Sequence, residues 1–375
     1  MLHGPAVATV RAGRDRAVYA DPRGVLLVRG GPGSDRTTVA LNCAPSPAHA
    51  HGQLSDGGIL VVSPAPAFLR RIRQVLPALN GASVMLLSIG DLYPGISWTA
   101  TESAATSAVK GDVRMAEVLA TAIRATRRLL GRDLTVYIAR DSLFQMELRL
   151  DRALCARAMA AAVRHGGGQH NRAREIFAAA ITEELACRIA DRIGFHAERW
   201  EVGALAPRLL AEPELAARIE ELWPTLTPET LVARLLTSRD RLAEAGAVLS
   251  EAERRSLLRA RLPGGSQAPY WTPGDIPLLD EAAELLGPPT VKHHDSALRA
   301  AKDRTADGPG RVIRHVIVDE AQELSTMAWR MLLRRCPSPS MTVVGEFGDT
   351  GGPTARGSWQ AVLDSIAEAS GGSSH

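Results

Sequence analysis

An acidic pair at the end of an apolar run is the strongest chemical feature of the sequence. The stretch HVIVDEAQ (315–322) places Asp319 and Glu320 directly after the run, and Gln322 follows two positions later. In ATPases with this arrangement the Asp holds Mg²⁺ and the Glu orients or deprotonates the attacking water. We therefore expect Asp319 to be a metal ligand and Glu320 to be catalytic. Gln322 would sense the γ-phosphate or pass its state to the nucleic-acid side. The alternative is an acidic pair that caps the next helix, which the complete DEAQ sequence makes the weaker interpretation.

A glycine-rich turn after an earlier apolar run is the second feature. The sequence GGPGSDRT follows VLLVR and approximates the phosphate-binding pattern G-x-x-x-x-G-K-[ST]. Asp35 replaces the last glycine and Arg36 replaces the lysine, whereas Thr37 retains the hydroxyl that binds Mg²⁺. The expected cofactors are therefore ATP and Mg²⁺. The candidate nucleotide-binding residues are Gly30, Gly31, Pro32, Gly33, Ser34, Asp35, Arg36, Thr37, Thr38 and Gln322, and the candidate metal ligands are Thr37 and Asp319.

The two substitutions weaken the predicted phosphate loop. A carboxylate about 5 Å from a phosphate charge costs roughly 3 kcal/mol at an effective dielectric constant of about 20, or about a hundredfold in affinity. Arg36 keeps the positive charge, but its planar guanidinium does not fit the pocket of a compact ammonium. We therefore expect weak ATP binding and little or no hydrolysis.

The elements that must position these residues are visible as apolar runs at both ends of the chain. Such runs, bounded by Gly and Pro and separated by helical stretches, are typical of buried parallel strands. The four main runs are 25–29, 59–62, 315–318 and 341–344, and a further strand candidate is 83–88. We expect the four to lie side by side in one mainly parallel sheet. Because open α/β sheets bind ligands at the carboxyl ends of their strands, the acidic pair should face the loop 30–37.

The middle of the chain has a different pattern. From about 103 to 263, apolar residues recur every three or four positions, which predicts helices throughout. Capping signals at Thr227 and Ser250 mark two helix starts, and Gly287 marks a helix end. The sequence therefore predicts an α/β domain interrupted by an all-helical insertion. The predicted ranges are 1–110 and 305–368 for the domain, 111–304 for the insertion with its connector, and 369–375 for a flexible tail.

Composition limits the other classes of function. The net charge of +3 is too small to indicate nucleic-acid binding by itself. The four cysteines lie far apart without metal-ligand spacing, and we expect them to be reduced and buried. No run approaches the about 20 apolar residues of a membrane span, and the N-terminus lacks a signal-peptide core. We therefore expect a cytoplasmic protein without a membrane partner.

Taken together, the motifs resemble the HelD-type proteins, which are UvrD/Rep-like ATPases of helicase superfamily 1 that act on bacterial RNA polymerase. The segments that carry the resemblance are GVLLVRGGPGSDRTTVAL, ILVVSPAPAFLRRIRQVLPAL, DLYPG, PLLDEAAELLG and HVIVDEAQELSTMAWRMLLRRCPSPSMTVVGE. The resemblance is strongest at 24–93 and 311–345. It implies a RecA-like P-loop NTPase domain, the first motor domain of a DNA helicase-type ATPase, with RNA polymerase as partner and DNA as a further candidate.

The sequence departs from this family at several places. Arg14 stands at the position of the adenine-reading glutamine, and Glu346 and Asp349 replace the Asp and Gln of a third motif. A second motor domain, which supplies an arginine to ATP in the family, is not recognised in this sequence, and a separate polypeptide is one candidate source of it. Two functions stay open: an ATP-binding module with weak or no hydrolysis, and a non-catalytic interaction protein that keeps the fold.

Arg-rich stretches in the helical middle also allow two interpretations. They are either contacts for RNA polymerase or nucleic acid, or solvated helix faces, and the second is the plainer one. The residues are Arg124, Arg127, Arg128, Arg254, Arg255, Arg259 and Arg261.

Overall fold

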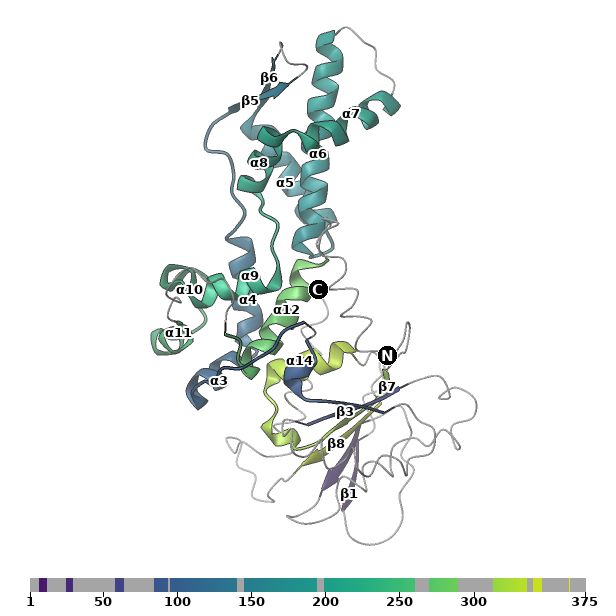
Figure 1. Ribbon diagram of the computed structural model, residues 1–375, viewed down its shortest axis with the longest axis vertical. Coiled ribbons are helices and arrows are strands. Elements are labelled where there is room, and N and C mark those ends of the chain that lie inside the picture. Colours follow the sequence, from purple (N-terminus) through teal and green to yellow (C-terminus); the bar gives the residue numbers. More distant parts are fainter. Residues whose placement is uncertain are drawn as a thin grey trace, which may run out of the picture. The chain divides into compact units, whose positions relative to one another are not determined.

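The computed structural model describes most of the middle of the chain and the strands of both ends (Figure 1). The described residues are 7–11, 25–29, 58–63, 84–93, 95–139, 145–193, 199–259, 270–288, 313–335, 340–345 and 364. The chain divides into two compact units. Unit 1 comprises Met1–Ala116, Leu262–Asp280 and Ser296–His375, and unit 2 comprises Glu117–Arg261 and Glu281–Asp295. The domain boundaries expected near 110 and 305 stay predictions.

Unit 1 is built on a parallel sheet. In the described residues this sheet has six strands in the order β1-β2-β8-β7-β3-β4, and every neighbouring pair is parallel. The strands are β1 (Val7–Arg11), β2 (Val25–Arg29), β3 (Gly58–Val62), β4 (Val84–Leu87), β7 (Ile313–Val318) and β8 (Met341–Gly345). The four runs expected to lie together do so, as β2, β8, β7 and β3. The prediction of a mainly parallel α/β sheet is confirmed.

The two C-terminal strands lie as a pair between N-terminal strands of this sheet. β7 and β8 lie between β2 and β3, so the sheet cannot form without both ends. The inner strands are buried on both faces: Leu60, Val61 and Val62 of β3 are fully buried, as are Val316, Ile317 and Val318 of β7. This two-sided burial is why these segments are continuous apolar runs.

Helices of unit 1 complete its core. α14 (Thr326–Arg335) connects β7 to β8 and buries Trp329 and Leu332 completely. α3 (Ala104–Lys110) and the short 3₁₀ helices η2 (Ile89–Asp91), η3 (Pro273–Asp275) and η4 (Ala321–Glu323) belong to the same unit. α4 (Arg114–Arg124) and α12 (Ile276–Leu286) each run from one unit into the other.

Unit 2 is mainly helical. Its helices are α5 (Arg152–His165), α6 (His170–Ile193), α7 (Arg199–Ala211), α8 (Pro213–Leu222), α9 (Pro228–Leu236), α10 (Arg239–Ala245) and α11 (Glu251–Leu257). The expected helix starts are present, since Thr227 caps α9 and Ser250 forms a capping box with Glu253. The expected stop at Gly287 has a φ of +69°, which glycine adopts without strain. Within the described part of the chain, none of the helices combines the length and apolar character needed to cross a bilayer.

The expectation of an all-helical insertion is wrong. Unit 2 contains an antiparallel hairpin of β5 (Leu134–Ala139) and β6 (Gln145–Leu150). Burial alternates along β5, where Val136 is fully buried and the next residue, Tyr137, is 50 % exposed. This period of two, together with β-branched residues, favours a strand over a helix. Each strand is only six residues long and lies in a region of helical periodicity, so the sequence pattern did not distinguish it.

Candidate functional site

The carboxyl ends of the parallel strands form one edge of the sheet, and Asp319 lies there. It follows β7 directly, and its backbone N–H donates to the carbonyl of Val62 on β3 at 2.9 Å. Its side chain is only 3 % exposed. A carboxylate so deeply buried requires hydrogen-bond donors or a cation close by. The expectation that Asp319 sits at the carboxyl end of its strand is confirmed.

Ser63 accompanies Asp319 on the neighbouring strand. Val62 pairs in register with Val318, so the residues that follow them, Ser63 and Asp319, come at the same level of the edge. Ser63 is fully buried. Sequence reasoning did not single it out, although the signal was the same as for Asp319, namely the first polar residue after an apolar strand. The edge therefore holds a hydroxyl and a carboxylate side by side.

This part of the edge is also where the topology reverses. From β3 the chain moves outward to β4, whereas from β7 it moves in the opposite direction to β8. Open α/β sheets have a crevice at such a reversal, since the two connections leave in opposite directions, and ligands bind there. Asp319 and Ser63 follow the two strands at the reversal.

Glu320 has an unusual backbone. Its φ of 48° and ψ of 46° lie in the left-handed region, and no other non-glycine residue in the described ranges has a positive φ. This conformation costs roughly 1–2 kcal/mol for a residue with a Cβ. It ends β7 abruptly and turns the chain into η4. Such strain persists where the surroundings fix the backbone, and it clusters at functional sites.

The side chain of Glu320 is held by the third residue of the motif. The Gln322 side-chain N–H donates to Glu320 Oε2 at 2.6 Å. Glu320 is half-buried, in contrast to the fully buried Asp319. The two carboxylates therefore have different environments, one enclosed at the strand end and one partly open to solvent. This difference matches a metal ligand beside a group that acts on water.

The predicted phosphate loop begins at the same edge. Leu27 of β2 pairs with Val343, which pairs with Val318, so Leu27 is level with the end of β7 and β2 continues two residues further, to Arg29. With β8 between them, the two strands are about 10 Å apart at a strand spacing of about 4.8 Å. The residues Gly30, Gly31, Pro32, Gly33, Ser34, Asp35, Arg36, Thr37 and Thr38 lie outside the described residues, as do Arg14, Glu346 and Asp349. Whether the loop faces the acidic pair stays a prediction.

Unit 1 also contains a buried charge cluster that sequence reasoning missed. Lys110, only 1 % exposed, pairs with Glu102 and with Asp275 Oδ1, the latter at 2.9 Å, and donates to Thr272 Oγ1 at 3.0 Å. The backbone N–H groups of Thr99 and Ala100 donate to the Trp271 carbonyl nearby in the chain. The cluster thus ties the segment 98–110 to 270–275, at the two ends of the long insertion. Its residues are too far apart in sequence for any motif to reveal.

Metal and thiol chemistry can be judged in the described residues. They contain no group of three or more His, Cys, Asp or Glu side chains placed to hold a metal ion. Cys155 is buried, and burial raises the pKa of its thiol to about 11, so it is unreactive. Cys187 is exposed, which corrects the expectation that the cysteines are buried.

No protein-family model matches the chain, and no curated protein sequence matches it. The resemblance to HelD-type proteins therefore rests on the motifs. The structure shows a mixed α/β protein with a parallel sheet, a buried Asp319 at its carboxyl edge and a strained Glu320 beside it.

Proposed function

We propose that unit 1 is a RecA-like P-loop ATP-binding domain of the helicase type, with its Mg·ATP site at the carboxyl edge of the sheet. The observation that carries the proposal is the position of Asp319. Its carboxylate is buried directly after a central parallel strand, at the topological reversal. The strand before the glycine-rich turn ends at the same edge, with only β8 between them.

The residues at this edge fit Mg²⁺ and a phosphate chain. Asp319 supplies the carboxylate oxygen that Mg²⁺ prefers, and Thr37 is the second ligand of the proposal. β2 and β7 are two strand spacings apart, about 10 Å, and this distance leaves room for phosphate groups between the turn and the acidic pair. Bound Mg²⁺ supplies positive charge to the phosphate oxygens. Glu320 orients water, and Gln322 holds the Glu320 carboxylate in place.

The proposal includes weak turnover. Asp35 brings a negative charge to the phosphates, and Arg36 replaces a compact ammonium with a planar group.

RNA polymerase and DNA are proposed partners through the motif resemblance alone. A non-catalytic interaction protein is the second candidate, and the specific feature that favours it is the sequence GSDRT, which places a carboxylate where the phosphates would bind.

The discriminating experiment is a calorimetric titration of the full chain with ATP, with and without Mg²⁺. We expect a Kd in the high micromolar range, because the Asp35 carboxylate costs about a hundredfold in affinity. Asp319→Asn should abolish the gain in affinity that Mg²⁺ gives, while leaving the Mg-free affinity nearly unchanged. Asp191→Asn, at an exposed position of α6, is the matched control. ATP that fails to bind the parent chain, or binds Asp319→Asn with an undiminished Mg²⁺ dependence, would support the interaction protein instead.

A further inference from the structure

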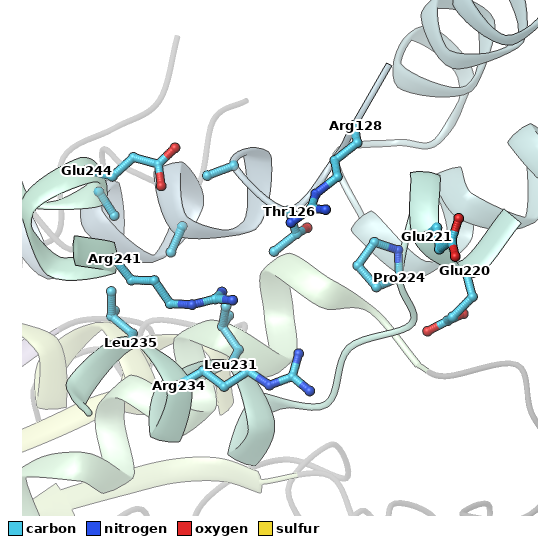
Figure 2. Close-up of a pocket in the computed structure, with 13 residues that line it drawn as sticks. Thr126, Arg128, Glu220, Glu221, Pro224, Leu231, Arg234, Leu235, Arg241 and Glu244 are labelled. Atoms are coloured by element: carbon cyan, nitrogen blue, oxygen red, sulfur yellow. The ribbon is translucent and has the colours of Figure 1, made fainter. Parts of the chain in front are cut away.

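A cavity of about 370 Å³ lies wholly within unit 2. Three arginines line it, each from a different element: Arg128 from the segment after α4, Arg234 from α9 and Arg241 from α10. Figure 2 shows Arg128 and Arg241 reaching in from different sides, with Arg234 along the lower side of the view. Exposed arginines are ordinary on a helical surface, but convergence of three on one cavity is not.

These arginines have no ion-pair partner among the described residues. All three side chains are exposed, and none makes a hydrogen bond or ion pair with another residue of the described ranges. The cavity wall also carries glutamates, of which Glu220 is paired with Arg174 and Glu221 with Arg218, each at 2.8 Å. In Figure 2 the carboxylate of the third, Glu244, lies apart from the three guanidinium groups. With Glu220 and Glu221 paired to arginines outside the lining, the lining sets three guanidinium charges against the single carboxylate of Glu244.

The backbone around the cavity is fixed before any ligand arrives. The N–H of Arg128 donates to the carbonyl of Leu222 at 2.8 Å, which anchors this segment to the end of α8. Thr227 caps α9 and Ser238 caps α10, so both helices have defined starts. Because the elements are already placed, the arginines can bind an anion without reorganising the main chain.

The lining indicates which class of anion fits. Guanidinium groups bind phosphate through paired, parallel N–H donors, and three of them match an anion with several charges. No aromatic side chain lines the cavity, so it offers no stacking surface for a base. Apolar residues such as Leu231 and Leu235 form part of the wall and strengthen the local electrostatic field. The volume is that of a small-molecule site.

We propose that this cavity in unit 2 is a polyphosphate site, which recognises a di- or triphosphate group through Arg128, Arg234 and Arg241. The group is carried either by free inorganic polyphosphate or by the tail of a nucleotide. This site is separate from the Mg·ATP site proposed in unit 1 and does not depend on it.

The test is a calorimetric titration of the full chain with sodium triphosphate in Mg-free buffer. Arg234→Gln and Arg241→Gln should each lower the affinity at least fivefold. Arg239→Gln, on the same helix α10 but outside the cavity lining, should change it less than twofold. Unchanged affinity in both cavity variants overturns the proposal. Because these side chains are exposed, we expect the variants to fold, and Arg128→Gln provides a third variant if a melting curve shows that one does not.

Two further comparisons, one between ligands and one between variants, identify the ligand and the site. Equal affinity for ATP and triphosphate, with none for adenosine, supports recognition of the phosphate tail; tighter binding of triphosphate than of ATP identifies free polyphosphate. Binding that survives Arg36→Gln but not Arg234→Gln assigns the site to unit 2, whereas the reverse overturns it. A single-stranded oligonucleotide that binds more tightly than triphosphate through the same arginines overturns the small-anion assignment in favour of a nucleic-acid backbone.

Discussion

Asp319 and Glu320 are adjacent in the chain, yet they differ in backbone conformation and in side-chain burial. Asp319 continues the sheet with a regular backbone hydrogen bond and a buried side chain. Glu320 accepts a left-handed backbone that glycine would adopt without strain, and keeps a partly exposed carboxylate. A residue that conflicts with its local backbone preference is expected at functional sites rather than in ordinary turns. The strain thus supports a role for the Glu320 side chain.

Two buried histidines should make stability depend on pH. His315 lies between the hydroxyls of Ser340 and Thr342, and the Nε2 of His170 lies 2.8 Å from the Pro224 carbonyl. Burial lowers the pKa of each from its ordinary value near 6.5 to about 4. Between these values the unfolded chain binds a proton that the folded chain does not. Stability should therefore fall as pH drops from about 6.5 to 4, by up to roughly 3 kcal/mol for each histidine.

The measurement is denaturant unfolding of the parent chain at several pH values from 7 to 4.5. His315→Gln should reduce the pH dependence of unit 1, and His170→Gln that of unit 2. His165→Gln, at an exposed position of α5, is the control and should leave both slopes unchanged. A parent chain whose stability is flat over this range would show that the folded and unfolded chains bind protons equally, and so that burial does not lower the pKa of these histidines.

At the scale of elements, sequence reasoning succeeded where burial is two-sided. The runs that became β3, β7 and β8 were predicted because a strand buried on both faces is continuously apolar. The same apolar pattern predicted β2 and β4, although β4 is only partly buried. The short strand β1 and the hairpin β5–β6 were missed, since five or six residues of alternating pattern give only a weak strand signal. Asp319 could be placed from its motif. Lys110 could not, because its partners Thr272 and Asp275 lie more than 160 residues away in the chain.

The Lys110 cluster should be the most sensitive contact between distant segments of unit 1. Lys110→Met would leave the carboxylates of Glu102 and Asp275 buried without their cation, and removing one partner of a buried pair costs about 3–5 kcal/mol. Arg114→Met is the matched control, because Arg114 pairs with Asp112 where both side chains are about one-third exposed. That substitution should cost about 1 kcal/mol or less. Equal losses in the two variants, measured by denaturant unfolding, would contradict this account of the cluster.

At the scale of the whole molecule, the two ends of the chain build one sheet around a long insertion. The α/β class and the parallel pairing of the four main runs in one sheet followed from the sequence, because apolar runs with helices between them leave few other arrangements. Whether the phosphate loop binds ATP could not be predicted as firmly from the sequence. Asp35 and Arg36 depart from a phosphate-binding pattern whose other positions are intact. The central claim is that an ATP site, weakened at this loop, lies at the edge marked by Asp319.

Restoring the loop tests that claim most directly. Asp35→Gly with Arg36→Lys rebuilds a complete G-x-x-x-x-G-K-T pattern and removes a charge that costs roughly 3 kcal/mol of phosphate affinity. By calorimetry, the double variant should bind Mg·ATP at least tenfold more tightly than the parent chain. Adding Asp319→Asn to the double variant should remove most of that gain, because both changes act on one site. Affinity that does not rise in the double variant, or a gain that survives Asp319→Asn, would contradict a shared nucleotide site at this edge of the sheet.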